Sequence, residues 1–249
     1  MTSRILILLF FSAFFFHAFS QDNDRNYLHN RTIMERVASG GQVGNAVVLG
    51  TLSSSPPSTI GDVYLSPDYR ITTFWLYDND QVAQGFSARL DLQRNEFDIN
   101  LGKGKGIKAL PGNKVRTLVM ADSISRTPQY FVNAQEFKNG DGEPFSGFFQ
   151  ILSEGELTLL KITSVAFKPA DHNPTHNTGI KDNRFMKKSE LFYAAGSSAN
   201  KLPGRKGILK LMESQKEKVD KFIQVNEINL GVERHLIALF DYYNSLTKM

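Results

Sequence analysis

Strict alternation of apolar and polar residues is the feature that most constrains the fold of this chain. From Phe86 to Leu92, and again from Phe97 to Leu101, every second residue is apolar and the residues between are polar. A period of two is typical of strands that bury one face and expose the other, and it excludes an amphipathic helix over these residues. The pattern therefore predicts a β-hairpin.

The register of this hairpin depends on its turn. A two-residue turn at Arg94-Asn95 pairs Leu92 with Phe97 and Leu90 with Ile99. All the apolar residues then share one face, whereas a slip of one residue would place them on opposite faces. Asn95 suits such a turn because asparagine tolerates a positive φ.

The same period recurs in short segments from Asp62 to Phe167, separated by turn signals. One of these turns is Glu154-Gly155, where glycine suits the positive φ of a two-residue hairpin turn. About nine short strands with no helical segment between them predict an antiparallel meander.

Two segments with helical periodicity end the chain. Ile208 to Ile223 and Val232 to Leu246 carry apolar residues at spacings of three and four, which is typical of amphipathic helices. The predicted fold class is therefore mainly β (α+β): an antiparallel meander forming a curved open sheet or partial barrel, with two C-terminal amphipathic helices. The predicted domains are a signal peptide at 1–20, an irregular lead-in at 21–44, an antiparallel β domain at 45–195, and a helical pair at 196–249 that begins with a linker and packs on the sheet.

The first residues have the three parts of a secretory signal peptide. Arg4 precedes an apolar run from Ile5 to Phe16, and small residues stand at Ala18 and Ser20. The run is too short for a transmembrane helix, which needs about 20 apolar residues. We expect cleavage near Ser20, export to the periplasm, the cell surface or the medium, and no transmembrane span.

The chain of 249 residues contains no cysteine. Disulfides, thiolate metal sites, thiol nucleophiles and a lipid-modified cysteine are therefore excluded. An exported chain of this size without disulfides is more typical of a bacterial envelope than of a eukaryotic secreted protein.

Positive charge is concentrated in one part of the sequence. Lys181 to Lys221 holds eleven Lys or Arg against five Asp or Glu. Such an excess can attract an anionic partner, which for an exported protein is a lipid head group, a polysaccharide or an acidic protein rather than nucleic acid. The alternative interpretation is a solvated helix face.

The hairpin register predicted above places Asp91 opposite Asp98 on the polar face, where Cβ atoms are about 5 Å apart. Such a pair of carboxylates is a candidate for general acid and base catalysis, or for binding a cation such as calcium. In the alternative interpretation, Arg89 or Arg94 neutralises the pair, or the turn is longer than two residues.

His172 and His176 are the weak candidates for metal ligands. Pro174 stands between them, which disfavours a helix, and no third ligand accompanies them in a zincin pattern. We therefore expect a solvated loop, with no bound metal and no cofactor. Elsewhere the sequence contains no nucleophile elbow and no phosphate-binding loop.

Five segments of the sequence are similar to those of other proteins: Ala88 to Leu92, Lys187 to Tyr193, Leu209 to Leu211, Lys221 to Ile223 and Leu239 to Asn244. In these segments the chain resembles a group of uncharacterised exported β-rich proteins of Bacteroidota-type bacteria. That group has no assigned activity, so the resemblance implies export and transfers no functional residue.

No catalytic signature is present, so we do not expect an enzyme, although catalysis stays open. The leading hypothesis is an exported non-catalytic protein that binds a partner or ligand in the periplasm or at the cell surface. One alternative is a hydrolase of envelope or extracellular polymer. Another is an amphiphile carrier that uses a concave sheet face, because the strand with Phe74, Trp75 and Tyr77 is apolar on both faces.

Overall fold

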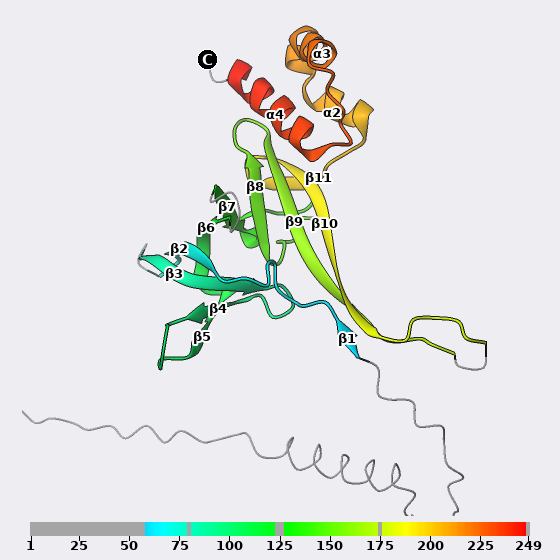
Figure 1. Ribbon diagram of the computed structural model, residues 1–249. Helices are drawn as coiled ribbons and strands as arrows, with labels where there is room; N and C mark the ends of the chain where they lie inside the picture. Colours follow the sequence, from blue (N-terminus) through cyan, green and yellow to red (C-terminus); the bar gives the residue numbers. More distant parts are fainter. Residues whose placement is uncertain (1–57, 79–80, 123–126, 174–175, 248–249) are drawn as a thin grey trace, which may run out of the picture. The chain divides into compact units, whose positions relative to one another are not determined.

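The computed structural model describes residues 58–78, 81–122, 127–173 and 176–247 (Figure 1). The chain divides into two units, Met1–Pro56 and Pro57–Met249, and all the described residues belong to the second. The expected signal peptide and lead-in, and the first residues of the predicted β domain, lie outside the described residues.

The described residues form one open sheet, as expected. Its strand order is β1-β10-β9-β8-β7-β6-β2-β3-β4-β5, with β11 paired to β10. The sheet is mixed rather than purely antiparallel, because β1 runs parallel to β10. The strands are β1 (Thr59–Ile60), β2 (Arg70–Leu76), β3 (Val82–Asp91), β4 (Glu96–Asn100), β5 (Ile107–Pro111), β6 (Val115–Ala121), β7 (Pro128–Asn133), β8 (Phe148–Ser153), β9 (Thr158–Lys168), β10 (Asn183–Ala195) and β11 (Ser198–Lys201).

The predicted mainly β class with C-terminal helices is confirmed, but the sheet is not a single meander. β6 pairs with β2 instead of β5, although only the 3₁₀ turn η1 (Gly112–Lys114) separates β5 from β6. In a flat sheet these strands would be about 19 Å apart, whereas the link spans at most about 14 Å. The sheet must therefore curl between β6 and β5.

Buried groups fix this curl. The side-chain amide of Asn133 donates to the carbonyls of Gly112 at 3.0 Å and Val115 at 2.8 Å. Phe97 packs edge-on against Phe74 and Phe148 on the inner face of the curled strands, with ring centroids 5.0 and 5.2 Å apart. These aromatic contacts fill the inner face of the curl.

The register predicted for the first hairpin is wrong by two residues. Leu90 pairs with Phe97, and a four-residue turn joins β3 to β4. The Asp91 carboxylate accepts hydrogen bonds from the backbone N–H groups of Gln93 and Arg94, each at 2.9 Å, and so stabilises the longer turn. Because the shift is even, the apolar residues still share one face.

The role predicted for Gly155 is also wrong. Its φ is not positive, so the turn does not require glycine for that reason. A Cβ at Gly155 would instead lie 2.3 Å from Cγ of the buried Asn244. The Asn244 amide accepts a hydrogen bond from the N–H of Leu157 at 3.0 Å and donates to its carbonyl at 2.9 Å. Glycine is required here because the C-terminal helix lies against the β8–β9 turn.

Three helices, rather than the expected two, follow the sheet: α2 (Arg205–Leu211), α3 (Lys216–Val225) and α4 (Glu233–Thr247). The 3₁₀ turn η3 (Glu213–Gln215) divides the first predicted helix, and the Ser214 hydroxyl lies 3.0 Å from the Tyr243 hydroxyl. The predicted linker also contains β11. The helices lie together beyond the ends of β8, β9 and β10 (Figure 1), where their apolar faces cover Leu157 and Leu159.

Candidate functional site

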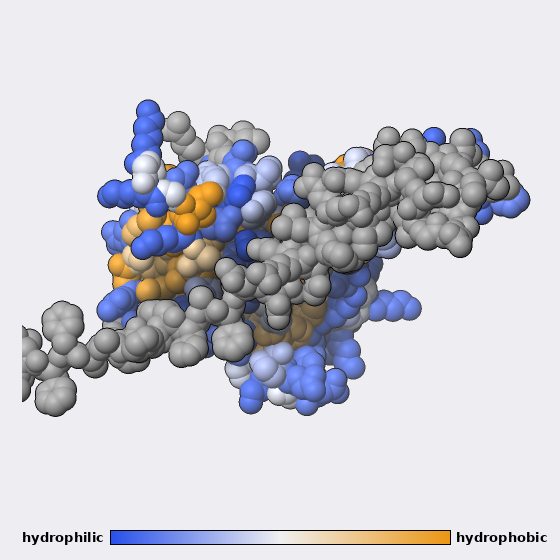
Figure 2. Space-filling view, turned by 90° about the horizontal axis from the view of Figure 1, so that it is seen from below, coloured by the Kyte–Doolittle hydropathy of each residue, from blue (hydrophilic) through white to orange (hydrophobic). Residues whose placement is uncertain are grey.

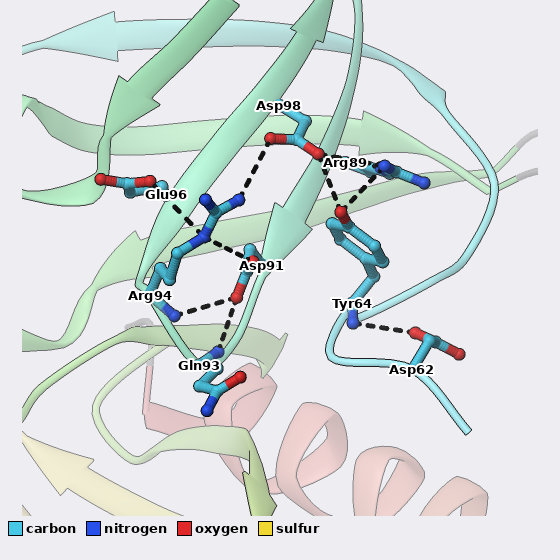
Figure 3. A network of polar contacts seen from close by, with 8 residues as sticks. All are labelled: Asp62, Tyr64, Arg89, Asp91, Gln93, Arg94, Glu96 and Asp98. Carbon is cyan, nitrogen blue, oxygen red and sulfur yellow. Dashed lines mark hydrogen bonds and ion pairs between the residues drawn. The ribbon is translucent and has the colours of Figure 1, made fainter. Parts of the chain in front are cut away.

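One cluster of charged residues surrounds the β3–β4 hairpin, where the sequence predicted a site (Figure 3). Arg89 of β3 is directly opposite Asp98 of β4, and its Nη2 lies 3.1 Å from Oδ2 of that carboxylate. The Tyr64 hydroxyl donates to the same oxygen at 3.0 Å. The Arg89 guanidinium also stacks 3.6 Å from the centroid of the Tyr64 ring. One arginine thus neutralises Asp98 and holds the Tyr64 segment on the strand.

Arg94 completes this network from the turn. Its Nε lies 2.9 Å from Asp91 and 3.7 Å from Glu96, and its Nη2 lies 3.6 Å from Asp98. The hydrogen bond to Asp91 raises the pKa of Arg94. Burial, followed by the hydrogen bond to Asp98, raises the pKa of Tyr64. The network therefore favours the charged arginine and the neutral tyrosine.

The placement of Asp91 opposite Asp98 is wrong: Asp91 pairs with Glu96, and Asp98 with Arg89. Asp91 is 2% exposed and Asp98 is 7% exposed. Both carboxylates are ion-paired with arginine, and the turn between their strands is longer than two residues; this is the arrangement of the alternative interpretation. In this geometry the two aspartates stabilise the hairpin.

The two histidines lie in the connection between β9 and β10. Nε2 of His172 is 3.4 Å from Oδ1 of Asn177, and the backbone N–H of His176 donates to Oδ1 of Asn173 at 3.4 Å. Across the described residues, no group of three His, Cys, Asp or Glu side chains is arranged to hold a metal ion. The structure thus adds no third ligand to these weak candidates.

A second cluster of charged residues lines a pocket of about 840 Å³. It lies where β9, β10 and β11 meet the beginnings of α2 and α4. We call it the basic pocket. Its cations are Lys161, Lys188, Lys201 and Arg205, its carboxylates are Glu190 and Glu233, and its apolar lining includes Leu191, Leu202, Ile208, Leu230 and Leu236.

Ion pairs connect the walls of the basic pocket. Lys161 of β9 lies 2.9 Å from Glu233 at the start of α4. Glu190 of β10 lies 3.3 Å from Lys188 and 2.6 Å from Lys201. The hydrogen bonds from Lys201 and then Lys188 lower the pKa of Glu190. This carboxylate therefore stays ionised at neutral pH and holds two of the cations.

The cations of the basic pocket outnumber its carboxylates by four to two. Arg205 makes no ion pair with any residue that the structure describes. Three of the four cations come from the basic segment Lys181 to Lys221 predicted from sequence, whereas Lys161 and Glu233 lie outside it. No local signal identifies those two residues, because their side chains enter the pocket only through the β9–β10 pairing and the position of α4.

Exposed apolar residues form a third feature. Ile71, Val82 and Ile107 on β2, β3 and β5 are 59%, 45% and 57% exposed. Figure 2 shows hydrophobic surface in the view from below, broken by hydrophilic residues. Nothing in the structure indicates what covers these residues, so we do not treat them as a site.

Comparisons with protein-family models, with curated proteins and with solved structures found no match for this chain. Of the helices in the described part of the chain, none combines the length and the apolar composition that crossing a membrane requires. The chemistry of the basic pocket is thus the basis for a functional proposal.

Proposed function

We propose that this chain is an exported, non-catalytic protein that binds a partner or ligand through an anionic group. The basic pocket is the binding site, in the periplasm or at the cell surface. The observation that carries this proposal is the composition of the pocket: four cations and two carboxylates around an apolar lining.

The pocket matches a ligand that is anionic at one end and apolar beside it. Arg205 has no carboxylate partner in the described residues, so its donors are available to a carboxylate, phosphate or sulfonate. Lys188 and Lys201 share one carboxylate, which leaves them with unused donors. Leu202 and Leu230 can contact an apolar group next to the anion.

The alternative functions have weaker support. A hydrolase needs a carboxyl group that exchanges a proton, whereas Asp91 and Asp98 are each ion-paired to an arginine. An amphiphile carrier that uses the concave face needs space there, whereas Phe74, Phe97 and Phe148 fill the inner face of the curl. The observations therefore favour binding in the pocket without catalysis.

The proposed export depends on the leader and on the resemblance to exported Bacteroidota-type proteins. Its test is expression of the full chain in a bacterium with two membranes, followed by N-terminal sequencing of the accumulated product. We expect a chain that begins near Gln21 in the periplasm or outside the cell. A full-length product that stays in the cytoplasm contradicts this part of the proposal.

The binding proposal is tested with hexanesulfonate, a small probe that is anionic and apolar, and with hexanol as its uncharged control. In ¹H–¹⁵N NMR spectra we expect hexanesulfonate to shift amide signals around Leu202 and Leu230, and hexanol to shift them less. Arg205→Gln should weaken the effect, whereas Lys105→Gln, which removes a cation from the β4–β5 loop, should not. Equal responses to both probes, or to neither, contradict the proposal.

A further inference from the structure

A second concave surface adjoins the basic pocket on α2. It has a volume of about 330 Å³, and we call it the α2 groove; its lining residues are Lys206, Leu209, Lys210, Glu213 and Lys216. Like the basic pocket, it has more cations than carboxylates and an apolar residue between them. The same combination of chemistry thus occurs twice.

The two concave surfaces lie on neighbouring sides of one helix. Successive residues of an α-helix are rotated by about 100°, so Arg205 and Ile208 share one side of α2, while Lys206 and Lys210 share the next. Arg205 and Leu209 are four residues apart and lie next to each other at the boundary. A ligand that leaves the basic pocket over Arg205 therefore reaches the α2 groove directly.

Charge is concentrated on this surface. The basic pocket and the α2 groove together contain seven cations and three carboxylates, an excess of four. This excess equals the formal net charge of the whole chain, +4. Cleavage near Ser20 removes Arg4 and leaves a net charge of +3, so the charges elsewhere in the exported chain sum to −1 and its positive excess lies on this surface.

We infer that the basic pocket and the α2 groove together bind one acidic peptide segment whose carboxylates are separated by apolar side chains. This inference rests on the proposed function and names its partner. The carboxylates pair with the cations, and the apolar side chains contact Leu202 and Leu230 in the pocket and Leu209 in the groove. Charge complementarity and the alternation of cationic and apolar lining carry the choice of partner.

The dimensions agree with an extended peptide. A helix with its side chains is about 10 Å wide, and an extended chain advances about 3.3 Å per residue. Crossing α2 thus takes about three residues. In the extended polyproline II conformation, which has three residues per turn, acidic residues at every third position point the same way and place one carboxylate on each side. A planar layer of lipid head groups matches this surface less well, because the cations of the protein line two concave sites on different sides of a helix.

The test uses a fluorescein-labelled peptide that repeats Glu-Leu-Ser, with Gln-Leu-Ser and Glu-Ser-Ser repeats as controls, in fluorescence anisotropy titrations. We expect the Glu-Leu-Ser peptide to bind most tightly. Arg205→Gln in the pocket and Lys210→Gln in the groove should each weaken binding about threefold, and the double variant about tenfold. Lys105→Gln, far from both sites in sequence and with the same change in charge, should leave binding unchanged.

The outcomes separate this inference from the proposed function. Weakening by Arg205→Gln but not by Lys210→Gln confines the ligand to the pocket, which overturns the inference and keeps the proposed function. Loss of all difference between peptide and controls, with no hexanesulfonate binding, overturns both. Tighter binding to polygalacturonate or to vesicles containing phosphatidylglycerol than to the peptide also overturns the inference, since the partner is then a polysaccharide or a membrane.

Discussion

The two charged clusters of this protein contain the same types of residue in opposite arrangements. Around the β3–β4 hairpin, Asp91 and Asp98 are nearly inaccessible, and each lies within 3.1 Å of an arginine. In the basic pocket, the cations outnumber the carboxylates, and Arg205 lacks an ionic partner among the described residues. The first cluster is neutralised internally, while the second keeps unused charge at the surface.

This difference distinguishes a structural cluster from a binding site. Buried charges must be paired because the loss of hydration is costly, so the hairpin network has little capacity left for a ligand. Exposed ion pairs contribute little to folding, so the pocket can exchange one partner for another at small cost. Substitutions in the hairpin network should therefore change stability, whereas substitutions in the pocket should change binding.

The largest effect should come from Arg89→Ala. This change removes the nearer of the two arginines that pair with the buried Asp98, and the guanidinium that stacks on Tyr64. We expect the free energy of unfolding to fall by about 3 kcal/mol, measured by urea denaturation. Arg89→Lys keeps the charge without the planar fork and should lose less. If Arg89→Ala were as stable as the parent, the hairpin network would not be structural.

Gly155→Ala should destabilise the helices around the basic pocket without destabilising the β3–β4 hairpin network. The added Cβ overlaps Asn244, so α4 must move away from the β8–β9 turn, and the wall of the pocket that carries Glu233 moves with it. We expect a loss of about 2 kcal/mol by urea denaturation. Amide exchange should accelerate in α4 but not in β3 and β4.

Gly140→Ala is the matched control for this variant. The nearest atom to a Cβ at Gly140 is the Asn200 side-chain oxygen at 3.9 Å, an ordinary contact distance. This control should therefore change stability by less than about 0.5 kcal/mol. A uniform acceleration of exchange through the whole sheet in Gly155→Ala would show that the pocket and the hairpin network unfold together.

Strand periodicity predicted the faces of the first hairpin correctly and its register incorrectly. The face of Leu90 depends only on whether the register shift is odd or even, and the predicted register differs from the observed one by two residues, an even number. The turn length depends on the Asp91 side chain, which bonds the backbone of the turn. A period of two contains no information about such a bond, so Asp91 was assigned to the wrong partner.

The helical segment illustrates a similar limit. Ile208, Met212, Val219 and Ile223 would share one face of a single straight helix, and all four are buried in the structure. These four residues stay in one hydrophobic cluster although η3 divides the helix, so their spacing in the sequence cannot reveal the division. Of the basic pocket, the sequence predicted the cationic segment, but the walls from β9 and α4 come from long-range pairing.

Glu190→Gln should have a small effect on stability and a measurable effect on binding. The carboxylate is partly exposed and its ion pairs are screened by solvent, so its loss should leave the free energy of unfolding almost unchanged. Lys188 and Lys201 would lose their partner, and hexanesulfonate affinity should rise about threefold in NMR titrations. Glu217→Gln on α3 removes the same charge outside the pocket and should not raise the affinity. A large drop in the urea midpoint would instead show that this carboxylate stabilises the fold.

The smallest effect should be the pH dependence of binding. The pKa of Glu190 is lowered by its two lysines. Its ionised form therefore contributes stability above the pKa of the unfolded chain, and that contribution is lost as the pH falls through the folded pKa. Hexanesulfonate remains charged throughout, so its affinity should be constant at neutral pH and rise only in acid, where the pH falls through the lowered pKa of Glu190 and protonation frees the lysines. In Glu190→Gln the rise should be smaller, and an unchanged rise in that variant would assign the titration to another group.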